Sequence, residues 1–302
     1  MTRALALLLT LLCAAPAWAD ASAFWKAWSD GKAELSGYTL VQPRYGELRQ
    51  GHAVLIFVTE PFSRSRGVKV DRYDPNDPDQ FTALKLNHVR KFQTGIYDYS
   101  LLTSVFVDPA RDMAPVKISF SAQEWCGHVY EEARFSPDGG KVRFDSYFEG
   151  ETGQTELRGA FVPVDALLIQ ARGLLANGPM SVQSKPTELL GAAMTRRLKH
   201  LPAALYRAQL TRGAPRPVEV PAGRFVVAPV SWTRPDGVAC AIDVEVAAPH
   251  RIIGWACQDG EQAKLTGSMR LPYWQTHGEG DEKLLKDLGL PAPPGRSATP
   301  AK

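Results

Sequence analysis

Along most of the chain, apolar and polar residues alternate, which is the pattern of β-strands that bury one face. The alternating segments are rich in valine, isoleucine, threonine, tyrosine and phenylalanine, and clusters of glycine, proline or aspartate separate them. A hairpin is predicted over 128–150, where Asp138-Gly139-Gly140 supplies the residues of a tight turn. The pattern before this hairpin predicts five strands, over residues 33–42, 52–62, 81–92, 97–107 and 116–125.

Helical spacing of apolar residues occurs in three places. Short helices are predicted over 22–29 and over 281–288. The longest predicted helix covers 165–177, with Asp165 as its cap and Gly178-Pro179 as its end. Strands return after it, over 205–211, 223–233 and 263–274 and in a cysteine-bearing hairpin.

These elements predict a mainly β protein, with a large antiparallel curved sheet or half-barrel, a central helix and short terminal helices. The apolar face of such a sheet has to be covered, and the central helix can lie inside the curve. Residues 20–160 would form an N-terminal antiparallel β region, and 161–289 a helix and β region continuous with it. Residues 290–302 have the composition of a disordered tail. A concave sheet of this kind is a natural place for an apolar ligand.

The start of the chain predicts an export signal over residues 1–19. Arg3 precedes an apolar run, and Ala17-Trp18-Ala19 has the small-x-small form that signal peptidase cuts after. Cys13 follows a leucine, which is too large for lipoprotein processing. No later segment reaches the roughly eighteen consecutive apolar residues that cross a bilayer. We therefore expect a periplasmic or secreted protein that begins after Ala19.

Net charge excludes a general nucleic-acid binder. The chain has 35 basic and 32 acidic residues, and removal of Arg3 with the signal lowers the net charge from +3 to +2. Residues 194–217 nevertheless hold six basic residues and no acidic one, so this segment could meet a polyanion or an anionic lipid surface, although a solvated strand face also explains it. The six are Arg196, Arg197, Lys199, Arg207, Arg212 and Arg216.

Three cysteines follow the predicted signal and permit three pairings. Two apolar runs flank Ala248-Pro249, and a hairpin folded about that pair places Cys240 opposite Cys257. A cross-strand disulfide fits this register. Such a bond would stabilise the fold by about 3 kcal/mol and would leave Cys126 unpaired.

Candidate chemistry is concentrated in "SFSAQEWCGHVYEEARF", residues 119–135. If this segment is one strand, alternation places four functional side chains on one face: Glu124, Cys126, His128 and Tyr130. Zinc binding would need more ligands than these. Side chains two residues apart on a flat strand stand about 7 Å from each other, which is too far for direct proton transfer. Catalysis by the thiol would therefore need a bulge at Gly127. The favoured interpretation is a strand with a buried Cys126, a hydrogen-bonded His128 and Trp125 in the core.

Two other groups of residues suggest binding. Tyr97 and Tyr99 share a strand face, and they could line a cavity together with Trp125 and Tyr130 or pack across the sheet. Residues 71–79 hold four aspartates, but calcium-loop spacing is absent, so a solvated loop is favoured. No metal site and no cofactor are predicted.

Several segments together resemble a family of exported bacterial proteins of unknown function, over about 25–289. They are "WSDGKAELSGYTL", "RYGELRQGHAVLIFVTEPF", "LKLNHVRKFQTGIYDYSLLTSVF", "KISFSAQEWCGHVY" and "SYFEGE". Some members carry the name "septum formation inhibitor Maf". The Maf nucleotide pyrophosphatases are cytoplasmic α/β proteins with an early serine-arginine-arginine motif that this chain lacks, so the name implies no activity here. The second half, with "DALLIQAR", "VPAGRFVVAPVSW" and "RLPYW", is similar to periplasmic half-barrel proteins that shelter lipids or lipoproteins.

The chain contains no nucleophile elbow, P-loop, dinucleotide fingerprint or zinc-protease helix. These absences favour a non-catalytic envelope protein that binds an apolar small molecule, a lipid or a partner protein in a concave β-sheet. One alternative is a thiol-dependent enzyme centred on Cys126 and His128, in which the imidazole would lower the pKa of an accessible thiol. Another is a purely structural envelope protein that is recognised through its edge strands.

Overall fold

The computed structural model describes residues 21–176 and 186–291. The export signal predicted over 1–19 lies outside the described residues, as do Gly178-Pro179 and all but the first two residues of the tail predicted over 290–302. In the described part, no helix is both long and apolar enough to span a membrane.

The described chain consists mainly of strands. Those of the first half are β1 (Ala33–Arg44), β2 (Glu47–Ser63), β3 (Val68–Lys69), β4 (Gln80–Thr94), β5 (Tyr97–Asp108), β6 (Ala114–Glu124), β7 (Gly127–Ser136), β8 (Gly139–Ser146) and β9 (Gly153–Arg158). Those of the second half are β10 (Val162–Pro163), β11 (Pro186–Leu190), β12 (Leu205–Gln209), β13 (Thr211–Arg212), β14 (Arg216–Val220), β15 (Gly223–Thr233), β16 (Ala239–Glu245), β17 (Ile252–Cys257) and β18 (Gln262–Leu271).

The helices are short. The α-helices are α1 (Ala21–Trp28), α2 (Leu167–Gln170), α3 (Ala193–Leu198) and α4 (Leu284–Asp287). The 3-10 turns are η1 (Pro109–Arg111), η2 (Val164–Ala166), η3 (Tyr273–Gln275) and η4 (Asp281–Lys283).

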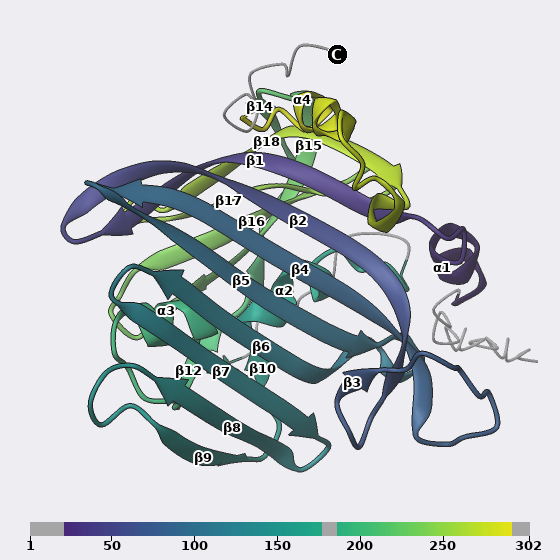
Figure 1. Cartoon of the computed structure of the whole chain (residues 1–302), viewed down its shortest axis with the longest axis horizontal. Helices are drawn as coiled ribbons and strands as arrows, with labels where there is room; N and C mark the ends of the chain where they lie inside the picture. The colour runs from purple at the N-terminus through teal and green to yellow at the C-terminus, as the bar shows by residue number, and fades with distance from the viewer. Residues whose placement is uncertain (1–20, 177–185, 292–302) are drawn as a thin grey trace, which may run out of the picture.

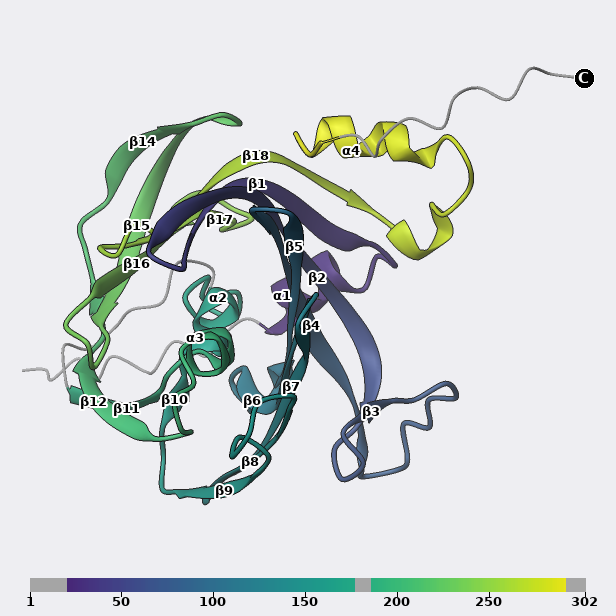
Figure 2. The same cartoon turned by 60° about the vertical axis from the view of Figure 1, so that its left-hand side comes forward.

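One 15-stranded antiparallel sheet joins the two halves of the chain, because β1 pairs with β2 on one side and with β18 on the other. Its order is β13-β15-β16-β17-β18-β1-β2-β4-β5-β6-β7-β8-β9, with β14 on β15 and β3 on β2. The sheet curls around α2 and α3 (Figures 1 and 2). A second, three-stranded sheet, β10-β11-β12, lies across the open side, with β12 beside β15. The predicted fold class, a curved antiparallel sheet around a central helix, is confirmed.

The prediction of one strand through residues 119–135 is wrong. Trp125 and Cys126 form a turn between β6 and β7, so that Glu124 pairs with Gly127 across a hairpin. The Glu124 carboxylate accepts a hydrogen bond from the Cys126 backbone N–H at 2.8 Å, which closes the turn. The hairpin is favoured because it turns the apolar faces of both strands into the same core.

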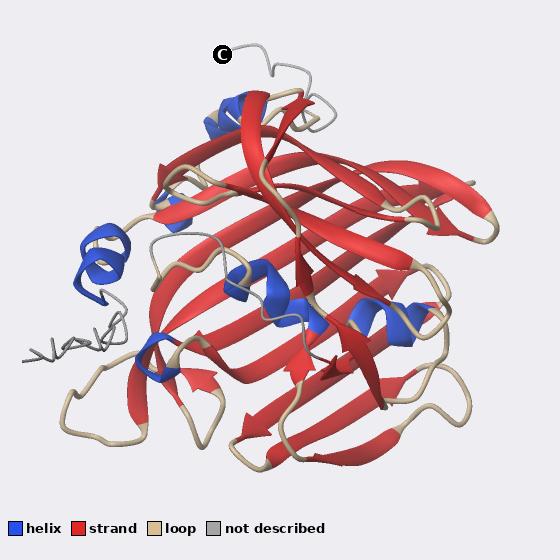
Figure 3. Ribbon diagram, turned by 180° about the vertical axis from the view of Figure 1, so that it is seen from behind, coloured by secondary structure: helices blue, strands red, loops and turns tan. Residues whose placement is uncertain are grey.

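The central helix is shorter than predicted. The segment that should be helical over 165–177 forms η2 and the four-residue α2, and Gly173 follows with a left-handed φ of 56°. Asp165 does not cap its own helix, because its Oδ2 accepts the N–H of Ala193 at the start of α3, at 2.9 Å. The two central blue helices, α2 and α3, lie inside the curve of the red sheet (Figure 3), and Leu167, Leu168 and Ile169 of α2 are buried. The helix therefore fills only part of the concave space.

Arg172 ties this central segment to the end of the sheet. Its side chain is fully buried, and its Nη2 lies 2.9 Å from Oε2 of Glu34, which is itself 2% exposed. Its Nε donates to the carbonyl of His250 at 2.8 Å, and its Nη2 to that of Pro249 at 3.0 Å. The guanidinium also lies 4.4 Å from the ring centre of Phe57. These contacts join α2 to β1, β2 and the turn before β17.

The C-terminal segment covers the outer face where the first and last strands meet. Leu288 packs there with Ala33, Leu35 and Val58. A Cβ at Gly37 would lie 2.2 Å from the carbonyl oxygen of Leu288, so only glycine allows this approach. Both faces of β1 are therefore buried near its start.

Candidate functional site

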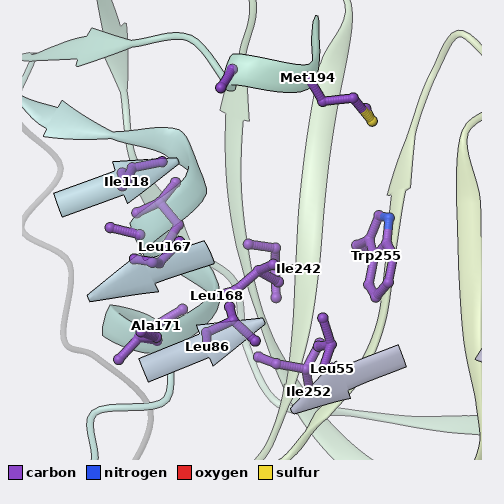
Figure 4. Close-up of a cluster of buried hydrophobic side chains, with 14 of the residues drawn as sticks. Leu55, Leu86, Ile118, Leu167, Leu168, Ala171, Met194, Ile242, Ile252 and Trp255 are labelled. Carbon is purple, nitrogen blue, oxygen red and sulfur yellow. The ribbon is translucent and has the colours of Figure 1, made fainter. Parts of the chain in front are cut away.

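A cavity of about 530 Å³ lies between the central helices and the second half of the sheet. Its walls are mostly apolar side chains from α2, α3, β12 and β15 to β17. Leu168, Met194, Ile242 and Trp255 line it (Figure 4). Trp232, Cys240, Leu205 and Tyr206 complete much of the wall. The arrangement can hold an apolar molecule of moderate size.

Strand alternation aims these side chains inward. On β16, Cys240, Ile242 and Val244 are buried, whereas the carboxylate of Asp243 points outward and pairs with Arg216 at 2.7 Å. The structure joins Cys240 to Cys257 by a disulfide across the predicted hairpin register, and both residues line the cavity. The disulfide therefore fixes the two strands that form one wall.

Charged groups in the cavity wall are bonded to one another. Nη1 of Arg90 donates to Oε1 of Glu261 at 2.7 Å and to Oε1 of Gln42 at 2.8 Å. The same Glu261 oxygen accepts the indole N–H of Trp255 at 2.9 Å. Nε of Arg90 donates to Nε2 of His88 at 3.0 Å. Each of these groups thus meets a protein partner without a ligand.

His88 is neutral at neutral pH. Burial, together with the adjacent Arg90 guanidinium, lowers the pKa of its imidazole well below the usual value. The hydrogen bond requires the same state, because Nε2 can accept from Arg90 only when it carries no proton. The wall therefore presents an uncharged imidazole beside the ion pair of Arg90 with Glu261, and Arg234, which also lines the cavity, pairs with Asp236 and Asp259.

A second set of buried charges holds α3 in place at the cavity wall, which Arg196 lines. Arg196 and Arg197 both bind the carboxylate of Glu131, whose exposure is 1%, and Nε of Arg197 lies 3.0 Å from it. Burial raises the pKa of Asp165, which also lines the cavity and accepts the Ala193 N–H. Five of the six basic residues in 194–217 make ion pairs with acidic residues on other elements, which neutralises most of that run: Arg196, Arg197, Lys199, Arg207 and Arg216.

The cavity opens beside the segment 199–204, which follows α3. Leu201 lines the cavity and is 45% exposed, and Asp236 in the β15–β16 turn stands at the same opening. Lys199 pairs with Asp236 at 3.1 Å, and His200 approaches Glu151 at 2.5 Å. These contacts hold the segment against two turns at one end of the sheet.

The sequence-predicted thiol group is not part of the cavity lining. Glu124, Cys126 and His128 sit on the β6–β7 hairpin, and Cys126 is a free, exposed cysteine rather than a buried one. The Glu124 carboxylate raises the pKa of the Cys126 thiol. Thiol catalysis was expected to lower that pKa, so the geometry gives no activated nucleophile.

The aromatic residues expected to bind a ligand gather at the end of the sheet instead. Tyr99 is fully buried, its ring stacks 4.9 Å from that of Phe92, and its hydroxyl lies 2.7 Å from that of Tyr45. Tyr97 lies between Tyr99 and the exposed Trp125, with ring centres 5.9 and 6.2 Å away. Tyr130 binds Glu132 through its hydroxyl at 3.0 Å. None of the four belongs to the described cavity lining.

The loop of four aspartates folds by local hydrogen bonds. Asp74 accepts the backbone N–H of Asn76 at 2.9 Å, and Asp77 accepts that of Asp79 at 2.9 Å. Asp79 binds the Ser63 hydroxyl and the Ser65 backbone N–H. Among the residues that the structure describes, no three His, Cys, Asp or Glu side chains are placed to hold a metal ion together.

Sequence reasoning missed the residues that do form the cavity, above all Trp232, Trp255, Met194 and Arg90. Trp232 occupies a buried position of an alternating strand, which was a visible signal of an inward direction, whereas the strand of Trp255 is buried at four successive residues and shows no alternation. Alternation does not show which part of the inner face the helices leave uncovered.

No family model and no curated protein matches the chain. Among solved structures, the chain is similar to a beta-barrel-like protein of the domain of unknown function DUF1849 from Brucella abortus. The two share 12% sequence identity with a TM-score of 0.46, over 80% of this chain and 97% of the other.

Proposed function

We propose that this protein is a non-catalytic binding protein that holds an apolar small molecule or lipid in the cavity. The observation that carries the proposal is the cavity of about 530 Å³, with apolar walls and charges that are already paired. Ligand pockets of roughly 300–1,000 Å³ with few polar groups are typical of small-molecule sites.

The paired charges also define the class of ligand. Arg90 and Glu261 neutralise each other and Arg196 is bound to Glu131, so a charged group that entered the cavity would lose its water without meeting an unpaired charge. The lining does hold buried N–H donors without a partner, Nε1 of Trp232 and Nε and Nη1 of Arg196, and a neutral hydrogen-bond acceptor of the ligand would suit them. The ligand should therefore be neutral within the cavity, and any charged group should remain at the opening beside Leu201 and Asp236. This description fits a neutral apolar compound or the acyl part of a lipid.

The proposal includes export of the protein to the periplasm or the medium, with cleavage near Ala19. The apolar run and the small-x-small site of residues 1–19 support it. The disulfide between Cys240 and Cys257 agrees with it, because such bonds persist in oxidising compartments. A mass measurement of the protein secreted by its own cell would test both the cleavage site and the bond.

Filling the cavity tests the binding function. Gly191 lines the cavity, and a Cβ there would meet only a ring carbon of Tyr206, at the ordinary distance of 3.7 Å. Gly153, outside the cavity lining, offers a matched control, because its Cβ would meet the Phe144 ring at 3.7 Å. We expect Gly191→Phe to weaken binding of the neutral dye N-phenyl-1-naphthylamine at least about tenfold, whereas Gly153→Phe should leave it unchanged.

Native mass spectrometry of protein purified gently from the envelope would show whether a bound apolar molecule is retained. Dye binding by Gly191→Phe at the wild-type level would contradict the proposed site. Failure of the wild-type protein to bind any apolar probe would favour the alternative of a structural envelope protein.

A further inference from the structure

Exposed large apolar side chains gather at one end of the sheet. Four connections there each carry one: Tyr45 between β1 and β2, Ile96 between β4 and β5, Trp125 between β6 and β7, and Tyr147 after β8. The last three are 82%, 68% and 65% exposed. We refer to these four residues as the apolar rim.

The connections at the opposite end of the same strands differ. Residues 109–113 link β5 to β6, and their apolar members Pro109 and Met113 are buried. Residues 137–138 link β7 to β8 and are proline and aspartate, the usual composition of a turn. Tight turns favour glycine, asparagine and aspartate, so the isoleucine and tryptophan of the rim are not explained by turn geometry. At the opposite end Val68, Tyr73 and Trp274 are 45–46% exposed, against 55–82% for the rim, so the stronger exposure of the rim indicates a contact made by that end.

The spacing of the rim suits a lipid surface. Successive hairpins of an antiparallel sheet lie two strand spacings apart, about 10 Å, so the rim extends along a row of hairpin tips, with Tyr97 between Tyr99 and Trp125. Tryptophan and tyrosine side chains are well accommodated at the level of lipid headgroups, and single tips can enter that layer independently.

The basic groups beside the cavity opening and one near Tyr45 are paired within the protein. Arg49 lies 2.9 Å from Glu47, and Lys199 and His200 bind Asp236 and Glu151. Asp98, Glu124 and Glu149 lie within two residues of the rim tips and make no ion pair with a described residue, so the free charge beside the rim is acidic. It disfavours an anionic lipid surface, and contact with an uncharged or zwitterionic one should be driven by burial of apolar side chains.

The cavity opens at the same end of the sheet as the rim. Its opening lies between Leu201 and the β15–β16 turn, and that turn is on the same side as the β1–β2 turn because β15 to β18 continue the antiparallel order. We propose that the apolar rim docks this end of the protein on the surface of a phospholipid bilayer, so that the cavity opening faces the lipid. This proposal rests on the proposed function, because docking serves the protein as the route by which the apolar ligand passes between the bilayer and the cavity.

Co-sedimentation of the mature protein with phosphatidylcholine vesicles tests the proposal. We expect the wild-type protein to bind, with little change between about 0.05 and 0.5 M salt, because screening does not weaken apolar contacts. The triple variant Ile96→Ser, Trp125→Ser, Tyr147→Ser should partition onto vesicles on the order of 100-fold less strongly. Tyr45 is left unchanged, since its hydroxyl is bonded to Tyr99.

A matched control removes exposed apolar side chains from the opposite end. Val68 and Tyr73 are 45% and 46% exposed, and Val68→Ser with Tyr73→Ser should bind vesicles like the wild type. Should the triple variant fail to fold, Ile96→Ser alone should still show roughly tenfold weaker binding, because that side chain is the most exposed of the rim.

Dye titration without vesicles measures the cavity separately, so that loss of docking and loss of ligand binding are distinguished. Absence of vesicle binding by the wild-type protein would overturn the docking proposal, as would equal binding by the triple variant. A wild-type dimer in solution that the triple variant dissociates, without vesicle binding by either protein, would assign the rim to self-association and also overturn it.

Discussion

Replacement of Arg172 by methionine should destabilise the protein more than any ordinary surface substitution. The side chain of Arg172 is fully buried, and its partner Glu34 is 2% exposed, so Arg172→Met leaves a buried carboxylate without its cation. Removal of one partner from a buried ion pair costs about 3–5 kcal/mol. Methionine keeps the stem packed near Phe57, which limits any cavity contribution to this figure. The loss is a large fraction of the roughly 5–15 kcal/mol that keeps a typical domain folded.

Chemical unfolding followed by circular dichroism measures this loss as a fall in the free energy of unfolding. Arg224→Met provides the control, because Arg224 and its partner Glu219 are 84% and 71% exposed, and such pairs contribute at most about 1 kcal/mol. The double variant Glu34→Met, Arg172→Met should recover most of the loss, since apolar replacement of both partners of a buried pair is often nearly neutral.

The reasoning would be refuted if Arg172→Met lowered the free energy of unfolding by less than about 1 kcal/mol, because a buried charge without its partner destabilises a fold by more than that. It would also be refuted if the double variant were as unstable as the single one. That result would mean that the two hydrogen bonds from Arg172 to the carbonyls of Pro249 and His250 dominate, rather than the ion pair with Glu34.

Two further predictions concern stability. Replacement of both Cys240 and Cys257 by serine should lower the free energy of unfolding by about 3 kcal/mol, as expected for a bridge between residues 17 apart, and equal stability of the oxidised wild type and this variant would contradict it. The pKa of His88 is lowered in the folded state, so below the unfolded value of 6.5 only the unfolded chain gains the proton, and stability falls as the pH drops from 7.5 to 5.5. His88→Gln should reduce that fall by about 1 kcal/mol, and an unchanged fall in unfolding experiments at the two pH values would show that His88 is not its source.

Alternation was sufficient to predict the strands and the cysteine register, because both depend on local pattern. A half-buried strand shows its two faces within a few residues, and the hairpin about Ala248-Pro249 pairs Cys240 with Cys257 across a short connection. The curved sheet followed from the need to cover one long apolar face. The closure of β1 on β18 had no local signal, since it joins residues at opposite ends of the chain.

The sequence of residues 119–135 does contain a pattern that argues against a single strand. Before the turn the buried apolar residues are even-numbered, as in Phe120 and Ala122, and after it they are odd-numbered, as in Val129 and Ala133. A continuous strand cannot bury both sets on one face. The change of parity therefore places a turn between them, and Cys126 falls on its tip.

The size of the cavity depends on the length of the central helix, which the local spacing of apolar residues did not determine. Apolar spacing favoured a helix through residue 177, which would have occupied more of the concave face, but α2 ends at Gln170. After α2, the side chain of Arg172 binds Glu34 near the start of β1, and the chain reverses at Gly173. These tertiary contacts override the helical propensity of the segment. The space left beside Trp255 and Ile242 is the cavity.

One short segment thus holds both a residue that lines the cavity and a residue that stabilises the fold. Leu168 lines the cavity, whereas Arg172, one helical turn later, is bonded to Glu34 near the start of β1 and to the turn before β17, away from the opening. The ion pair can be removed without changing the cavity walls, and the cavity can be filled at Gly191 without touching the ion pair. Under conditions where it stays folded, Arg172→Met should therefore bind an apolar dye as the wild type does, and Gly191→Phe should keep its stability while losing the dye.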